Sequence, residues 1–324
     1  MKSTLLLFVC LFLCSFTVSA QVYQLAEMNT EQIKNLNRDK TAVIIPGGIL
    51  EEHGPFLPSF TDGYFNEQLT KELAKAISMK AGWSAVIFPT IPLGNSGAND
   101  VGGKFSFPGT YAVRFNTLRS VFMDLATELG EQKFKWIFVV HFHGAPNHNR
   151  ALDQAGDYFR DTYGGHMVNL TGLMPVMTGG PENRSDNDRK EDGIQLHSGL
   201  NETSMMLALR PDLVSSGYKN AQSFPGAKME DLIQISRKPD WLGYFGAPRL
   251  ASAKYYSSGW QTYLNEALSI ADKILNGLDE RKIIRFGDEM KKSVADVRLD
   301  KESLINESEI ERKQVLWLKR QKLK

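Results

Sequence analysis

The stretch from Ile44 to Asp62, IIPGGILEEHGPFLPSFTD, limits most strongly what this chain can fold into. An apolar run at residues 42–45 stops at a Pro-Gly-Gly turn, and the segment beyond it is stiffened by further glycine and proline. This pattern predicts a buried strand that opens into a loop. The loop carries four side chains that can bind a metal or transfer a proton: Glu51, Glu52, His53 and Asp62.

Apolar runs alternate with helical periodicity along the rest of the chain. The runs predict strands at residues 41–45, 84–92, 135–140 and 166–170, and the periodicity predicts helices at residues 63–79, 114–129, 147–163, 201–209 and 252–278. Residues 21–37 indicate a helix or an extended lead-in. Strands that read as continuous apolar runs are typical of a parallel sheet buried on both faces. We therefore predict an α/β fold with a mainly parallel sheet.

The first twenty residues predict a secretory signal peptide. Lys2 precedes an apolar core at residues 5–16, and residues 18–20 (VSA) form a small-residue cleavage site. The apolar core is too short to span a membrane. We expect cleavage after Ala20 and export to the periplasm or the medium. A lipid anchor on Cys10 or Cys14 is an alternative, which the large residues before both cysteines disfavour.

Composition excludes several classes of function. Both cysteines lie within the predicted signal peptide, so the mature chain cannot hold a disulfide, a cysteine nucleophile or a thiolate metal site. Its stability must therefore come from a sizeable core. The formal net charge is +1, which does not indicate a nucleic-acid-binding protein.

Histidine and carboxylate side chains follow the ends of predicted strands. Glu51 and His53 are two residues apart, so an extended loop points both to one side. Asp62 precedes a predicted helix, and His143 follows the third predicted strand, where loops of a parallel sheet converge. Glu202 opens a short predicted helix. Zinc and manganese bind imidazole nitrogen and carboxylate oxygen, so these five residues are candidate ligands.

Charge balance favours two ions at such a site. Two divalent cations bring four positive charges, and three carboxylates with one hydroxide offset them; without metal the carboxylates would repel one another. Structural alternatives remain open for single residues. Asp62 can cap the helix that follows it, and Glu202 can favour a helix N-terminus through the dipole. One histidine of the pair His141 and His143 can belong to the core.

Four blocks of the sequence together resemble the creatininase (creatinine amidohydrolase) family. The first is E-x-H-G-P-x-L-P from Glu51, followed by Thr61-Asp62. The others match in order: residues 107–110 (FPGT), residues 143–147 (HGAPN) and residues 197–204 (HSGLNETS). The resemblance extends over about residues 35–275.

The resemblance implies a three-layer α/β/α sandwich, often a homohexamer, with a two-metal site. Carried over by position, the ligands of zinc or manganese are Glu51, His53, Asp62, His143 and Glu202, and Asp62 bridges the ions. Members hydrolyse cyclic amides or formamide-type C–N bonds, and a few act in peptide maturation. We expect the hydrolase domain at residues 21–278 and a charged, helical C-terminal extension at residues 279–324.

The chain departs from the family pattern on the substrate side of the site. Phe56 stands where the family has histidine, Leu200 where it has glutamate, and Ala145 where creatininase has a carboxylate ligand. Residues 98–101 (ANDV) replace the usual acid–histidine pair. These changes argue against creatinine as the substrate, and they make the second ion less firmly predicted than the first.

Two classes of function follow. The first is an exported metal-dependent amidohydrolase, in which a metal-bridged hydroxide attacks the carbonyl of a small cyclic amide or formamide. A general acid must protonate the leaving nitrogen; the candidates are Glu52, Asp100 and His197, and we favour His197. The second is a non-catalytic binding protein on the same scaffold. A phosphoesterase ranks last, because nothing basic near the loops suits a phosphate.

Overall fold

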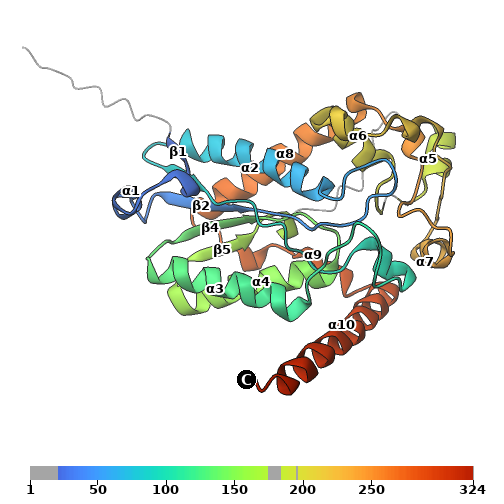
Figure 1. Ribbon diagram of the computed structural model, residues 1–324. Coiled ribbons are helices and arrows are strands. Elements are labelled where there is room, and N and C mark those ends of the chain that lie inside the picture. Colours follow the sequence, from blue (N-terminus) through green and yellow to red (C-terminus); the bar gives the residue numbers. More distant parts are fainter. Residues whose placement is uncertain (1–20, 174–183, 195, 324) are drawn as a thin grey trace, which may run out of the picture.

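A computed structural model of the protein describes residues 21–173, 184–194 and 196–323. The predicted signal peptide, residues 1–20, lies outside the described residues. A five-stranded sheet forms the centre of the described chain, in the order β1-β3-β2-β4-β5, and every pairing is parallel (Figure 1). The strands are β1 (Gln21–Gln24), β2 (Thr41–Pro46), β3 (Ser84–Ile87), β4 (Trp136–Val140) and β5 (His166–Asn169).

Helices cover both faces of the sheet (Figure 1). One face carries α2 (Thr61–Ser78) and α8 (Ala253–Leu275), and the other carries α3 (Phe115–Glu131) and α4 (Pro146–Tyr163). The predicted three-layer α/β/α sandwich is confirmed. Each of the four helices begins and ends within three residues of the predicted bounds, because each buries one apolar stripe at helical spacing.

The sequence of the central strand β2 does not alternate between apolar and polar residues, because both faces of the strand are covered. All six residues of the strand are buried. Val43 and Ile45 pack in the core with α3 and α4, whereas Ala42 and Ile44 pack in the core with α2 and α8. Successive side chains of a strand point to opposite faces, so a strand between two helical layers must be apolar at every position.

The N-terminal segment adds an edge strand to the sheet. Residues 21–37, predicted as helix or lead-in, form β1, a short 3-10 turn and α1 (Thr30–Lys34). Strand β1 pairs with β3 and is largely exposed, so its sequence lacks the apolar run that marks the inner strands. Strand β3 ends at Ile87, five residues before the predicted end.

Further α-helices of the described residues follow in the second half of the chain. They are α5 (Asp186–Asp192), α6 (Leu200–Leu209), α7 (Met229–Arg237), α9 (Phe286–Met290) and α10 (Val294–Arg320). The C-terminal end of α10 extends away from the body of the protein (Figure 1). Within the described ranges, no helix combines the length and the apolar character that a bilayer crossing needs.

Candidate metal centre

The five candidate ligands meet at the carboxyl edge of the sheet. Glu51 and His53 lie in the loop after β2, Asp62 lies in the first turn of α2, His143 follows β4, and Glu202 lies in the first turn of α6. The first four are buried, and the Glu202 side chain is one-fifth exposed. The edge gathers them because β2 and β4 are adjacent parallel strands.

Close packing at the end of β2 sets the course of this loop. A Cβ atom at Gly47 would lie 1.7 Å from Nε2 of His141, so glycine alone lets the backbone pass that ring. The Asn66 side chain on α2 joins the two strand ends: its Nδ2 donates to the carbonyl of Gly47 at 2.8 Å, and its Oδ1 accepts from the Phe142 amide at 2.8 Å. Sequence reasoning missed Asn66, whose signal is a polar residue within the apolar stripe of α2.

One group of candidate ligands consists of Glu51, Asp62 and His143. Nδ1 of His143 lies 2.9 Å from Oδ2 of Asp62 and 3.3 Å from Oε2 of Glu51. The far nitrogen, Nε2, lies 2.6 Å from the carbonyl oxygen of Ser96. A carbonyl only accepts, so Nε2 carries a proton, and in the neutral imidazole the lone pair of Nδ1 faces the carboxylates.

A second group consists of His53, Asp62 and Glu202. Nε2 of His53 lies 3.6 Å from Oδ1 of Asp62 and 3.5 Å from Oε2 of Glu202, and it is buried without a hydrogen-bond partner. Its Nδ1 donates to the carbonyl of Glu51 at 3.1 Å. Asp62 thus presents one oxygen to each group. Phe60, not Asp62, occupies the N-cap position of α2.

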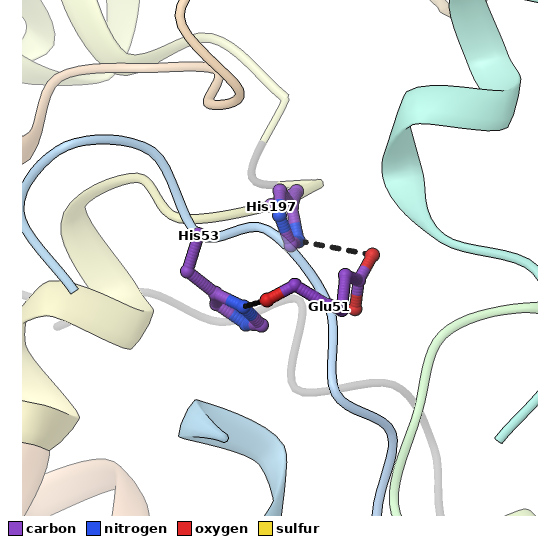
Figure 2. A group of neighbouring side chains, drawn as sticks. All are labelled: Glu51, His53 and His197. Carbon is purple, nitrogen blue, oxygen red and sulfur yellow. Dashed lines mark hydrogen bonds and ion pairs between the residues drawn. The ribbon is translucent and has the colours of Figure 1, made fainter. Parts of the chain in front are cut away.

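The imidazole of His197 is oriented like those of His53 and His143, with one ring nitrogen on a backbone carbonyl and the other facing carboxylates. Its Nε2 donates to the carbonyl of Glu52 at 2.5 Å, and its Nδ1 lies 3.9 Å from Glu202. The same Nδ1 lies 3.7 Å from Glu51 (Figure 2). Its ring centroid is 4.4 Å from that of His53. Glu51, His53 and His197 make up a third group that could hold an ion. Sequence reasoning placed His197 at the site as an acid and missed this ligand-like geometry.

The electrostatics of the cluster are those of a cation site. Burial would raise the pKa of Asp62, but the neighbouring imidazoles of His143 and His53 hold it well below its usual range. Burial would lower the pKa of His53, but Asp62 and Glu202 raise it to about 10. The pKa of His143 is likewise raised well above its usual value, because Glu51 and Asp62 outweigh burial. The carboxylates therefore stabilise positive charge at the imidazoles.

Glu52 lies beside the cluster without belonging to any of the three groups. Burial raises the pKa of its carboxyl to about 7, which the charge of His197 opposes and that of Glu51 reinforces. The Thr110 hydroxyl donates to Oε2, whereas Oε1 is buried without a hydrogen-bond partner. This carboxyl can therefore hold or release a proton near neutral pH.

Asp100, the third candidate acid, lies one step away from the cluster. Its carboxylate accepts hydrogen bonds from Ser96, Asn99 and Ser303, none of which is a candidate ligand. Ser303 belongs to α10, so this carboxylate joins the site loop to the C-terminal helix. Burial raises its pKa to about 6.

The pair His141 and His143 divides into a core residue and a site residue. His141 is fully buried beneath the site, with Nδ1 3.2 Å from Nε2 of His148. Burial lowers the pKa of both His141 and His148, so both are neutral scaffold residues. Phe56, at the position of a family histidine, packs its ring 5.6 Å from that of Tyr244.

The chain is similar to known proteins over most of its length. The family model for creatininase, described as creatinine amidohydrolase, matches residues 26–269. The mycofactocin precursor peptide peptidase of Mycolicibacterium smegmatis is 25% identical over 255 residues, which cover 76% of this chain and 90% of that protein. The corresponding peptidase of Mycobacterium ulcerans is 22% identical over 239 residues, which cover 71% and 84%.

Solved structures with the same fold carry creatininase names. A mutant creatininase complexed with creatine has a TM-score of 0.57 at 18% identity and covers 78% of this chain and 98% of its own. A putative creatinine amidohydrolase from Bacteroides fragilis has a TM-score of 0.55 at 21% identity, with 79% and 97% covered. A creatininase named for manganese has a TM-score of 0.54 at 20% identity, with 81% and 99% covered.

Proposed function

We propose that this chain, which belongs to the creatininase family, is a metal-dependent amidohydrolase that cleaves a C–N bond. One observation carries the proposal: three histidines each donate one ring nitrogen to a backbone carbonyl. Each turns its other ring nitrogen toward two of the three carboxylates, which are those of Glu51, Asp62 and Glu202. Metal-binding histidines have this arrangement, in which a second hydrogen bond fixes the tautomer and the ring.

The donor set fits divalent cations. Nε2 of His53 is buried, has no hydrogen-bond partner and faces two carboxylates at 3.6 and 3.5 Å. Leaving such a nitrogen unpaired is costly, and a cation between it and the carboxylates would satisfy all three. Zinc and manganese both accept imidazole nitrogen and carboxylate oxygen.

The groups define how two ions would be held. Glu51, Asp62 and His143 would hold one ion, and His53, Asp62 and Glu202 the other, with one oxygen of Asp62 for each. His197 would add its Nδ1 beside Glu51, in place of the carboxylate that creatininase has at the position of Ala145. Bound divalent ions lower the pKa of water toward neutrality and polarise a carbonyl.

The chain itself supplies orientation and a proton carrier. The backbone carbonyls of Glu51, Glu52 and Ser96 hold the three imidazole rings, so the donors are aligned before substrate arrives. Glu52 is the group we assign to proton transfer to the leaving nitrogen, because its Oε1 is buried and unpartnered. His197 is less suited to that role, since its protonated nitrogen is committed to the carbonyl of Glu52.

We propose a small amide as the substrate, with two candidate classes. Cyclic amides and formamides are the first, in line with the creatininase names of the structural relatives. Amide bonds of short peptides are the second, and the two curated relatives, both precursor peptide peptidases, favour them. Export through the segment at residues 1–20 and assembly into a homo-oligomer belong to the same proposal.

Elemental analysis with a substrate panel tests the proposal. We expect the purified full chain to hold zinc or manganese in near-stoichiometric amount and to hydrolyse at least one cyclic amide, formamide or short peptide. Asp62→Ala should lose both metal and activity, because both groups share this carboxylate. Asp124→Ala, at an exposed position on α3, is the matched control and should keep both. A metal-free, inactive parent supports the binding-protein alternative, and an active, metal-free Asp62→Ala protein refutes the metal assignment.

A further inference from the structure

The C-terminal helix α10 lies beyond the segment that the family model matches, yet it contacts the loop next to the metal centre. The two buried residues of α10 are Asp296 and Ser303, so the helix presents a narrow buried side to the body. Ser303 Oγ donates to Oδ2 of Asp100 at 3.0 Å. One turn further along, the Glu307 carboxylate accepts from Nδ2 of Asn95 at 2.6 Å.

Helix α10 contacts the loop at residues 94–102. The backbone of this loop forms hydrogen bonds with two of the candidate ligands. The Ser96 carbonyl accepts from Nε2 of His143 at 2.6 Å, and the Ala98 amide donates to Oε1 of Glu51 at 2.5 Å. Each of these contacts uses the backbone of the loop. Their geometry therefore depends on the course of the loop rather than on the identity of its side chains.

The loop has a backbone conformation that needs external support. Ser96 has a φ of 63°, in the left-handed region that non-glycine residues seldom adopt. Its hydroxyl donates to Oδ2 of Asp100 at 2.8 Å, the same oxygen that accepts from Ser303. The two serine hydroxyls are 3.5 Å apart. Ser303 thus closes a three-residue cluster around the strained position.

Glu307 provides a second point of attachment. Its carboxylate also accepts a hydrogen bond from the Phe115 amide at the start of α3, at 2.8 Å. The N-cap residue of α3 makes no side-chain capping bond, so Glu307 takes that place. A carboxylate is favourable at a helix N-terminus. Asn95 in turn donates its backbone amide to Nδ1 of His148 beneath the site. Helix α10 therefore holds the loop from both ends of the segment between Asn95 and Asp100.

We propose that α10 is a positioning element of the metal centre, and that Ser303 and Glu307 are its positioning residues. By holding the loop, they set the Ser96 carbonyl that orients His143 and the Ala98 amide that orients Glu51. Neither residue touches the candidate ligands directly. The effect on the ions rests on the proposed function, whereas the effect on the loop does not.

The test compares Ser303→Ala and Glu307→Ala with Ser308→Ala in the full chain. Ser308 is an exposed serine of the same helix whose hydroxyl donates to its own helix backbone, so it is a matched control. Hydrogen–deuterium exchange of the metal-free protein should speed up at residues 94–102 in both test variants and not in the control. The Zn²⁺ affinity, measured by competition with a chelator, should fall about tenfold in the test variants, the lower end for residues behind metal ligands. Ser303→Thr keeps the hydroxyl and should restore the parent affinity.

Each outcome decides the inference. Parent exchange rates at residues 94–102 in both folded test variants overturn it, whether or not the protein binds metal. Faster exchange with parent Zn²⁺ affinity and parent kcat overturns the link between α10 and the site. If the parent chain binds neither Zn²⁺ nor Mn²⁺, the proposed function fails, and the exchange rates alone then decide whether α10 positions the loop.

Discussion

Nδ1 of His143 lies 2.9 Å from Oδ2 of Asp62, although the two residues are 81 positions apart in the chain. His143 follows β4, and Asp62 sits in the first turn of α2, which begins after the loop that leaves β2. The parallel pairing of β2 with β4 brings these two ends together. The contact makes Asp62 the common member of two candidate ligand groups.

We expect His197→Ala to lower metal affinity, because Nδ1 of His197 faces Glu51 and Glu202 in the manner of a ligand. The measurement is the Zn²⁺ affinity by chelator competition. The control is His166→Gln, at a histidine that begins β5, stacks on Trp136 and pairs with Glu280 rather than with the cluster. A variant that keeps the parent affinity while kcat collapses would instead assign His197 to proton transfer.

Glu52→Gln should lower kcat by about 10²- to 10⁴-fold, the usual contribution of a general acid or base. The amide keeps the size of the side chain and can still accept from Thr110, but it cannot transfer a proton. Elemental analysis should find the parent metal content. Glu128→Gln, at an exposed position of α3, is the control. If both the metal content and kcat fell, Glu52 would position the metal ligands rather than transfer a proton.

The contribution of Asp153 on α4 to the stability of the folded state should decrease as pH rises. Burial raises the pKa of its carboxyl from 3.8 to about 7, against the opposing charge of Arg285. The folded state therefore binds this proton more tightly than the unfolded chain. The resulting stabilisation is fully present below about pH 4 and is lost as pH rises through about 7.

Asp153→Asn removes this titration and should flatten the pH dependence of the free energy of unfolding between these limits, by an amount on the order of a few kcal/mol. Urea denaturation at pH 5 and pH 8 measures it, and Asp124→Asn serves as the exposed control. Equal pH dependence in Asp153→Asn and the parent would show that the buried carboxyl does not hold its proton.

The candidate site was predictable where its residues share one local segment or one strand end. Glu51, His53 and Asp62 stand in a single short segment of the chain, and the position of His143 after a strand placed it at the same sheet edge. The orientation of His197 was not predictable. It depends on a hydrogen bond to the carbonyl of Glu52, 145 residues earlier, and a backbone carbonyl leaves no mark in the sequence.

The sequence by itself determined the layers of this protein, because the alternation of apolar runs and helical stripes is a local pattern that follows from burying each element on one or two faces. It also determined that the loop after β2 carries Glu51 and His53. Only the tertiary structure decided that Nδ1 of His197 faces Glu51 and Glu202 and that Ser303 reaches Asp100, 203 residues before it. Such contacts depend on how separate elements pack in space, and local side-chain preferences do not encode the distance between them.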